Sequence, residues 1–257
     1  MTRPAADRDA IAGELVAAER DRRSIGRLTD RFDLDVTSAY AVQQAMFERR
    51  LADGDRLLGY KLGLTSRAKQ EAMGVSEPLW GRLSARMLHQ EDSPLDVATL
   101  IHPRVESEIA FVLGAPVDGT TATVPSVLAA TAGLFPALEV LDSRFEAFSF
   151  ALPDVIAANA SAARVVLGGR TVPPDAIDLQ TEGMVLRQDG EVVATAAGAA
   201  ISGHPAAAVA WLAREVGGLD AGQIILSGGL TAPITLKPGT YVSAEFTHLG
   251  TVGLRCR

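Results

Sequence analysis

Residues 102–114 have the sequence HPRVESEIAFVLG, in which two glutamates are followed by five consecutive apolar residues. An apolar run of this length, closed by a glycine, is typical of a strand buried inside a sheet. Side chains alternate along a strand, so Glu106 and Glu108 share one face. Like charges side by side repel each other unless water or a cation separates them. The stretch therefore predicts a buried strand that carries two acids, and it indicates a cation between them.

A third acid, Glu139, lies in a second apolar run, FPALEVLDS. Its neighbours are apolar on both sides, and an isolated carboxylate in such surroundings is costly unless it is paired or bound to a metal. Three carboxylates without a nearby cysteine or histidine favour a hard cation, Mg²⁺ or Mn²⁺. The alternative is that arginines such as Arg104 and Arg144 neutralise the glutamates, because ion pairs also hold buried acids.

From residue 56 onward, short runs rich in Val, Ile and Leu alternate with glycine and proline, a pattern that predicts many strands. Residues 183–196 predict a hairpin that turns at an Asp-Gly pair. Two helices are expected to interrupt the strands, at 124–132 and 205–216. The other expected strands lie near 57–64, 106–114, 135–143, 163–169, 223–230 and 240–256.

Residues 1–55 have apolar residues at helical spacing, with charged residues between them. One helix of this region is expected at 36–51, capped by Asp35 or Thr37. We expect these helices to pack on the main domain or on a partner subunit. The predicted fold is α+β, with a small helical N-terminal region (1–55) and a β-rich catalytic domain (56–257).

The 257 residues are 47% apolar and carry a net charge of −7, which allows a sizeable core. No basic run is present, so nucleic acid is not an expected partner. The sequence contains no stretch of about 18 apolar residues, and its polar N-terminus does not resemble a signal peptide, so no membrane association is expected. The single cysteine, Cys256, cannot form an internal disulfide, which fits a cytoplasmic protein.

Lys61 is a second candidate for chemistry, in the stretch LLGYKLGL. It stands alone among apolar residues and has a glycine two positions away on either side. A buried lysine beside a metal can bind a substrate carboxylate or take part in proton transfer. The alternative is an edge lysine whose ammonium reaches water. Leu64, three residues further on, is expected to line the substrate pocket.

Two loops supply further candidate substrate contacts. Asn159 and Ser161, in AANASA, offer small polar groups that can orient a substrate. Gly229 and Thr231, in SGGLTAP, lie in a backbone-rich loop near a strand end. A glycine loop is weak evidence alone, because most such loops are tight turns.

These stretches together resemble the 2-keto-4-pentenoate hydratase and 4-oxalocrotonate decarboxylase family, which belongs to the fumarylacetoacetate hydrolase-like superfamily. The resemblance extends from about residue 15 to the end. It implies Mg²⁺ on Glu106, Glu108 and Glu139, with Mn²⁺ as an alternative, and a substrate-binding lysine at Lys61. It also implies a mixed, barrel-like core of the fumarylacetoacetate hydrolase C-terminal type, a homo-oligomer, and a complex with the sister hydratase. The motifs that carry it are GYKLGLTS, MGVSEPLWGRL, LIHPRVESEIAFVL, PALEVLDSRFEAF, ANAS and GAAISGHPAAAVAWLA.

The motif EPLWG favours one branch of the family. Hydratases usually carry an aspartate where this chain has Leu79, and the apolar residue, expected to contact substrate, resembles the decarboxylase branch. The chain also departs from the family pattern at Ala158, where an aspartate is usual, and at Ala162, where a serine is frequent. A role that the usual aspartate or serine has in the family cannot be assigned to Ala158 or Ala162. The exact substrate is therefore left open.

The resemblance thus implies a Mg²⁺-dependent decarboxylase of an unsaturated 2-oxo acid, 2-oxo-3-hexenedioate (4-oxalocrotonate). The products would be 2-hydroxypenta-2,4-dienoate and CO₂, in the meta-cleavage catabolism of aromatic compounds. The alternatives are a 2-keto-4-pentenoate hydratase, or another lyase, hydrolase or tautomerase of 2-oxo acids from the same superfamily.

Overall fold

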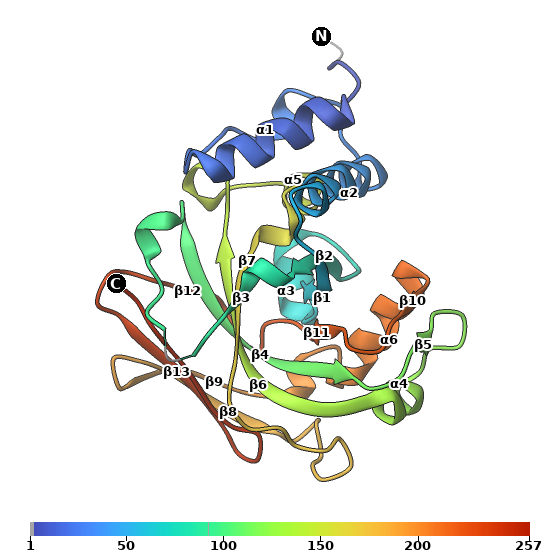
Figure 1. The fold of residues 1–257 in the computed structure, drawn as a ribbon, viewed down its shortest axis with the longest axis vertical. Coiled ribbons are helices and arrows are strands. Elements are labelled where there is room, and N and C mark those ends of the chain that lie inside the picture. The colour runs from blue at the N-terminus through green and yellow to red at the C-terminus, as the bar shows by residue number, and fades with distance from the viewer. Residues whose placement is uncertain (1–2, 92) are drawn as a thin grey trace.

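A curled, mixed sheet forms the centre of the molecule in the computed structural model, which describes residues 3–91 and 93–257. Its strand order is β2-β1-β11-β4-β6-β7-β3, and β12 pairs with β4 beside this path. The two longest strands, β4 and β6, form an antiparallel pair that curves across the molecule (Figure 1). The strands are β1 (Leu57–Gly63), β2 (Leu79–Ser84), β3 (Leu88–His89), β4 (Pro103–Leu113), β6 (Thr131–Asp142), β7 (Ala162–Leu167), β11 (Ile224–Leu226) and β12 (Ile234–Thr235).

A second, four-stranded sheet has the order β14-β13-β8-β9. Its hairpin confirms the expected turn, because Asp189 and Gly190 both have positive φ, 51° and 89°, as a tight two-residue turn of this kind requires. The four strands are β8 (Gly183–Gln188), β9 (Glu191–Ala197), β13 (Tyr241–Phe246) and β14 (Gly250–Arg255), and a two-stranded piece pairs β5 (Val117–Asp118) with β10 (Gly218–Leu219).

The N-terminal region is helical, as expected. Helix α1 (Arg8–Arg20) is capped by Asp7, and α2 (Val36–Ala52) by Asp35, whose carboxylate accepts from the backbone N–H of Ser38. Both helices lie at one end of the molecule (Figure 1). Their apolar faces pack with α5 (Leu152–Ala157) in a core of their own. The division into 1–55 and 56–257 as separate domains stays a prediction.

The expectation of two helices after residue 56 was wrong, because the described chain has four there. Helix α6 (Pro205–Val216) lies where expected, and α4 (Val124–Ala130) ends two residues early because β6 begins at Thr131. The missed helices are α3 (Arg67–Met73) and α5. Both are too short to show a clear apolar periodicity. Among the described helices, none combines the length and apolar character that a membrane crossing needs.

The two faces of the central sheet have different environments. One face packs with α4, α6 and the second sheet around a large apolar core that includes Ile109, Phe111 and Leu138. The other face carries Glu106, Glu108 and a smaller apolar cluster that includes Ala110 and Ala137. Because side chains alternate along β4, the same strand supports the main core and presents acids on its opposite side.

Candidate active site

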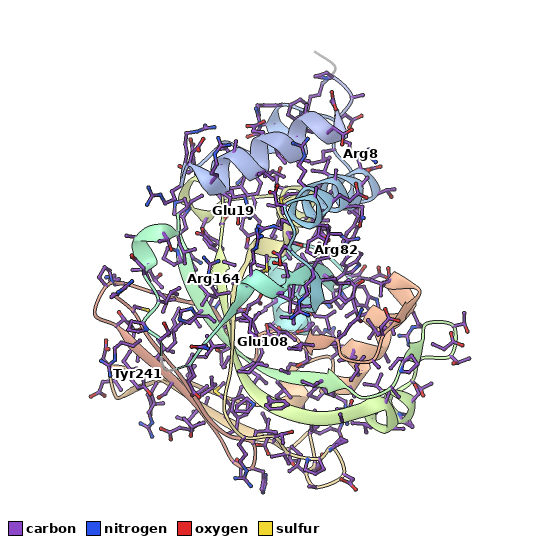
Figure 2. The ribbon with its side chains drawn as sticks, viewed as in Figure 1. Arg8, Glu19, Arg82, Glu108, Arg164 and Tyr241 are labelled. Atoms are coloured by element: carbon purple, nitrogen blue, oxygen red, sulfur yellow. The ribbon has the colours of Figure 1, made fainter. Side chains whose placement is uncertain are left out.

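The three predicted acids converge on one face of the central sheet. Glu106 of β4 lies directly opposite Glu139 of β6 in the strand register, and Glu108 follows two residues along β4. One carboxylate oxygen from each lies within 4.8 Å of the others. Glu108 and Glu139 are fully buried, and Glu106 is 6% exposed. Figure 2 labels Glu108 near the middle of the view, over the central strands.

Lys61 faces this cluster from β1, so the alternative of an edge lysine reaching water was wrong. Its Nζ lies 2.9 Å from Glu139 Oε2 and donates to the Ala160 carbonyl at 3.2 Å. Burial alone would lower the pKa of Lys61, but the charges of the three glutamates outweigh it, so the pKa is raised. The side chain is therefore a buried ammonium.

Lys69 is a second cation at the cluster, and the sequence analysis missed it. Its Nζ lies 2.7 Å from Glu106 Oε1 and 3.1 Å from the Gly229 carbonyl. It comes from α3, whose first turn is fixed by Ser66, the N-cap. The position of Lys69 depends on how α3 packs, and α3 was not predicted. No local sequence pattern therefore indicates that Lys69 lies beside the acids.

The arginines that were considered as partners of the acids contact other groups. Arg144 is buried and pairs with Glu19 of α1, and Arg104 lies 3.8 Å from the ring centroid of Phe148. Figure 2 shows Glu19 on the side of α1 that faces the rest of the molecule. The arginine alternative was therefore wrong, and the two lysines supply the charge compensation.

Two lysines leave the three acids incompletely satisfied. Glu108 Oε2 accepts from the Gly228 N–H at 2.6 Å, but Glu108 Oε1 and both oxygens of Glu139 make no hydrogen bond to any residue that the structure describes. The 2.9 Å contact of Glu139 with Lys61 is an ion pair outside hydrogen-bond geometry. Burial, followed by the charge of Glu139, raises the pKa of Glu108 well above its ordinary value. Buried carboxylate oxygens without partners fit a hard divalent cation.

A cavity of about 260 Å³ opens beside Lys61 and Glu106. Leu64, Leu79 and Ser161 line it, and their contact with a substrate stays a prediction. Ser161 Oγ is buried and has no hydrogen-bond partner within residues 3–91 and 93–257. The remaining lining is mainly apolar and comprises Gly63, Met73, Leu141, Phe148, Phe150, Val155, Ala160, Ala232 and Pro233, with Lys69.

Three other predicted contacts do not line this cavity. The side-chain amide of Asn159 binds the backbone of Arg82 in β2: it accepts from the Arg82 N–H at 2.7 Å and donates to the Arg82 carbonyl at 2.8 Å. It therefore holds β2 in place and does not face the cavity. Thr231 lies outside the cavity wall, although the next two residues belong to it. Gly229 lies behind Glu106, and a β-carbon there would be 2.4 Å from the Glu106 carboxyl carbon.

Strained backbone borders the cavity. Leu64, Phe148, Ala160 and Ser161 all line it and all have φ between 52° and 58°, which side chains with a β-carbon rarely adopt. Each such residue costs on the order of 1–3 kcal/mol and persists only where the surrounding structure imposes it. The concentration of these residues at one cavity is typical of a functional site.

Comparison with known proteins identifies the family of this chain. The family model described as fumarylacetoacetate (FAA) hydrolase C-terminal matches residues 70–256. A protein of Pseudomonas sp. (strain CF600) named 4-oxalocrotonate decarboxylase is 39% identical over 96% of this chain and 95% of its own. A 2-keto-4-pentenoate hydratase of Paraburkholderia xenovorans (strain LB400) is 38% identical over 95% and 93%.

The solved structure of 4-oxalocrotonate decarboxylase from Pseudomonas putida G7, complexed with magnesium and adipate, superposes with a TM-score of 0.95. It is 37% identical, and the match covers all of both chains. This likeness confirms the mixed, barrel-like fold expected from the resemblance. The chain is a member of the fumarylacetoacetate hydrolase C-terminal family.

Proposed function

We propose that this chain is a Mg²⁺-dependent decarboxylase of 2-oxo-3-hexenedioate, with Mn²⁺ as an alternative metal. The products would be 2-hydroxypenta-2,4-dienoate and CO₂, in the meta-cleavage catabolism of aromatic compounds. The observation that carries the proposal is a buried set of three carboxylates with unpartnered oxygens, beside a lysine and a mainly apolar cavity. The likeness to relatives named 4-oxalocrotonate decarboxylase supports the choice of substrate.

Glu106, Glu108 and Glu139 would hold the cation. When bound, it would supply Lewis-acid stabilisation of the negative charge that develops at the 2-oxo oxygen of the substrate. Gly229 has no side chain, which lets the Glu106 carboxylate lie against the backbone of its loop. Gly228 fixes one oxygen of Glu108 through its N–H. The loop therefore sets the positions of two of the three acids.

Lys61 binds and orients the carboxylate next to the 2-oxo group. A lysine ammonium has three N–H donors, and Lys61 donates one hydrogen bond to the Ala160 carbonyl and forms an ion pair with Glu139. Because Lys61 also lines the cavity, an N–H donor remains for a substrate. Ser161 Oγ, buried without a partner, supplies a neutral hydrogen bond on the same wall. Together they hold the substrate in one orientation.

The apolar wall favours loss of CO₂ from the far end of the substrate. Leu64, Leu79 and Phe150 line the cavity, and a carboxylate is less stable against such an apolar wall than uncharged CO₂. The C5–C6 bond breaks, and its electron pair forms the C4=C5 double bond. The C3=C4 pair moves to C2–C3, and the 2-oxo oxygen gains the charge and then a proton, which gives the dienol.

A hydratase is the second candidate, since one relative carries that name. Addition of water to a diene needs a base that can position the water. Among the described residues that line the cavity, the ionisable ones are Lys61, Lys69 and Glu106, and all three are ion-paired. Leu79, 4% exposed, occupies the place of the acid expected in a hydratase. The cavity therefore favours decarboxylation over hydration.

Product analysis tests the proposal directly. Purified protein with Mg²⁺ should release one CO₂ per 2-oxo-3-hexenedioate consumed and should form 2-hydroxypenta-2,4-dienoate. A protein treated with a chelator is the control and should release none. Hydration of 2-hydroxypenta-2,4-dienoate without any decarboxylation would overturn the assignment in favour of the hydratase.

We also propose that the protein is a cytoplasmic homo-oligomer that associates with the sister hydratase. A buried free thiol, Cys256, fits a reducing compartment. Strand β9, which pairs with β8 within the described chain, exposes Val192 and Val193 at 52% and 44%, an apolar pair that a neighbouring subunit would cover. Light scattering of the protein alone, and of a mixture with the hydratase, measures both associations.

A further inference from the structure

We infer that Lys69 is a substrate-binding residue that pairs with Glu106 until the metal enters and then binds the carboxylate of the 2-oxo acid. The inference rests on the proposed function and adds a residue to it. The geometry supplies the first argument. Lys69 Nζ lies 2.7 Å from Glu106 Oε1, so it contacts the carboxylate of a proposed metal ligand.

The two lysines differ in how firmly they are held. Lys61 is 3% exposed and belongs to a central strand, whereas the Lys69 side chain is 24% exposed and belongs to the seven-residue helix α3. Lys69 is attached to the cluster through Glu106, its most exposed member, and through the Gly229 carbonyl. Lys69 is therefore the cation that can leave with little rearrangement.

The charges of the site give the second argument. With the three glutamates ionised, as metal ligation requires, and both lysines protonated, the site has a formal charge of −1. A divalent cation changes that charge to +1, which attracts the carboxylate of a 2-oxo acid. Without Lys69, the formal charge of the site would be −2 before the cation binds and 0 after it binds. Lys69 therefore weakens metal binding and strengthens anion binding to the loaded site.

Position gives the third argument. Lys69 lines the same cavity as Lys61 and Ser161 and contacts a proposed metal ligand. An ammonium released from Glu106 has donors free beside the end of the substrate that carries the 2-oxo and carboxylate groups.

Calorimetry on the full chain tests the inference with two separate titrations. The first titrates Mg²⁺ into the metal-free protein. The second titrates 2-oxopentanoate, a saturated 2-oxo acid, into protein with saturating Mg²⁺. Lys69→Met should tighten Mg²⁺ binding by about threefold to tenfold, because a repelling charge is gone. It should weaken 2-oxopentanoate binding by about tenfold or more, because a charged hydrogen bond is lost.

Two controls separate this role from damage to α3. Lys69→Arg keeps the charge and should retain 2-oxopentanoate binding. Arg67→Met removes an exposed cation of the same helix, whose partner is Glu71, and should change neither titration. The inference is overturned if Lys69→Met matches wild type, or if it weakens Mg²⁺ and acid binding together. If wild type itself binds neither probe, the proposed function fails first.

Discussion

Lys61 Nζ lies 2.9 Å from Glu139 Oε2, and both side chains are buried, at 3% and 0% exposure. The pair joins β1 to β6, which the sheet order separates by β11 and β4. A buried ion pair is not a strong source of stability by itself, but removal of one partner leaves an uncompensated charge. Removing either partner alone should therefore destabilise the metal-free protein by more than the net stabilisation that the intact pair provides.

The first prediction concerns that ion pair. Lys61→Met should lower the free energy of unfolding of the metal-free protein by about 3–5 kcal/mol, because Glu139 is left buried and unpaired. Urea unfolding measures the change. The double variant Lys61→Met/Glu139→Gln removes both charges and should recover much of the loss. A double variant less stable than the sum of the single variants would contradict the pairing.

The second prediction concerns Mg²⁺ and stability. Wild type should gain about 2.7 kcal/mol at a Mg²⁺ concentration a hundredfold above Kd, because the ion binds the folded chain. Glu106→Gln should lose this gain and the activity while keeping its fold, since Glu106 lies at the outer edge of the cluster. Thermal unfolding with and without Mg²⁺, with circular dichroism as the check on the fold, distinguishes the two proteins. Retained activity in the variant would remove Glu106 from the metal site.

The third prediction concerns the glycine behind Glu106. Gly229→Ala should weaken Mg²⁺ binding by about 10–100-fold, because a β-carbon 2.4 Å from the carboxyl carbon must displace the ligand. Gly169→Ala is a matched control, because a β-carbon at Gly169 meets no atom within 4 Å. Calorimetric titration with Mg²⁺ measures both. Equal affinities would show that Glu106 can move without loss of metal.

The fourth prediction concerns the choice of reaction. Leu79→Asp should decrease CO₂ release from 2-oxo-3-hexenedioate by at least about tenfold, because a carboxylate in the apolar wall repels the substrate dianion and admits water. Leu79→Ala keeps the wall uncharged and should retain more of the decarboxylation. The ratio of hydration to decarboxylation, measured by product analysis, should rise in the aspartate variant alone. An unchanged ratio would remove Leu79 as a determinant of the reaction.

The fifth prediction concerns acid stability at the N-terminal helices. The charges of Arg144 and Arg50 outweigh the effect of burial and lower the pKa of Glu19 to about 2. The folded pKa lies below the ordinary 4.5, so the stabilisation is complete above about pH 4.5 and is lost as pH falls toward 2. Glu19→Gln should cost about 1–2 kcal/mol at pH 7, a value reduced because the side chain is 35% exposed.

Urea unfolding at pH 7 and pH 3 checks this prediction. The difference between wild type and Glu19→Gln should be smaller at pH 3 than at pH 7. Glu14→Gln is a suitable control, because Glu14 pairs with Arg31 at the surface and has no buried partner. A difference that stays constant with pH would show that Glu19 stabilises the helices by packing rather than by charge.

Much of the fold could be predicted from local pattern, because alternation and turn chemistry act over a few residues. The two-residue spacing of Glu106 and Glu108 correctly placed both acids on one face. The pairing of Glu106 with Glu139 could not be derived that way, since it depends on the register between strands that are distant in sequence. The apolar run around Glu139 made it a candidate third ligand, and the family resemblance, rather than strand register, implied that it shares one metal with Glu106 and Glu108.

The parts that were missed depend on tertiary contacts. Lys69 reaches the acids through a helix too short to predict, and Arg144 is drawn away by Glu19, more than a hundred residues earlier. Asn159 was assigned to the substrate because a small amide can bind one. The structure instead uses that amide on the backbone of Arg82. A sequence pattern shows which groups a side chain offers, but not which neighbour takes them.

The arrangement of the acids on β4 and β6, with Lys61 on β1, has a consequence for how the chain folds. The proposed metal site exists only after strands distant in sequence have paired, so a cation has no comparable site in the unfolded chain. Such long-range pairing forms slowly. The onset of Mg²⁺ binding during refolding would therefore report that the central sheet has finished pairing.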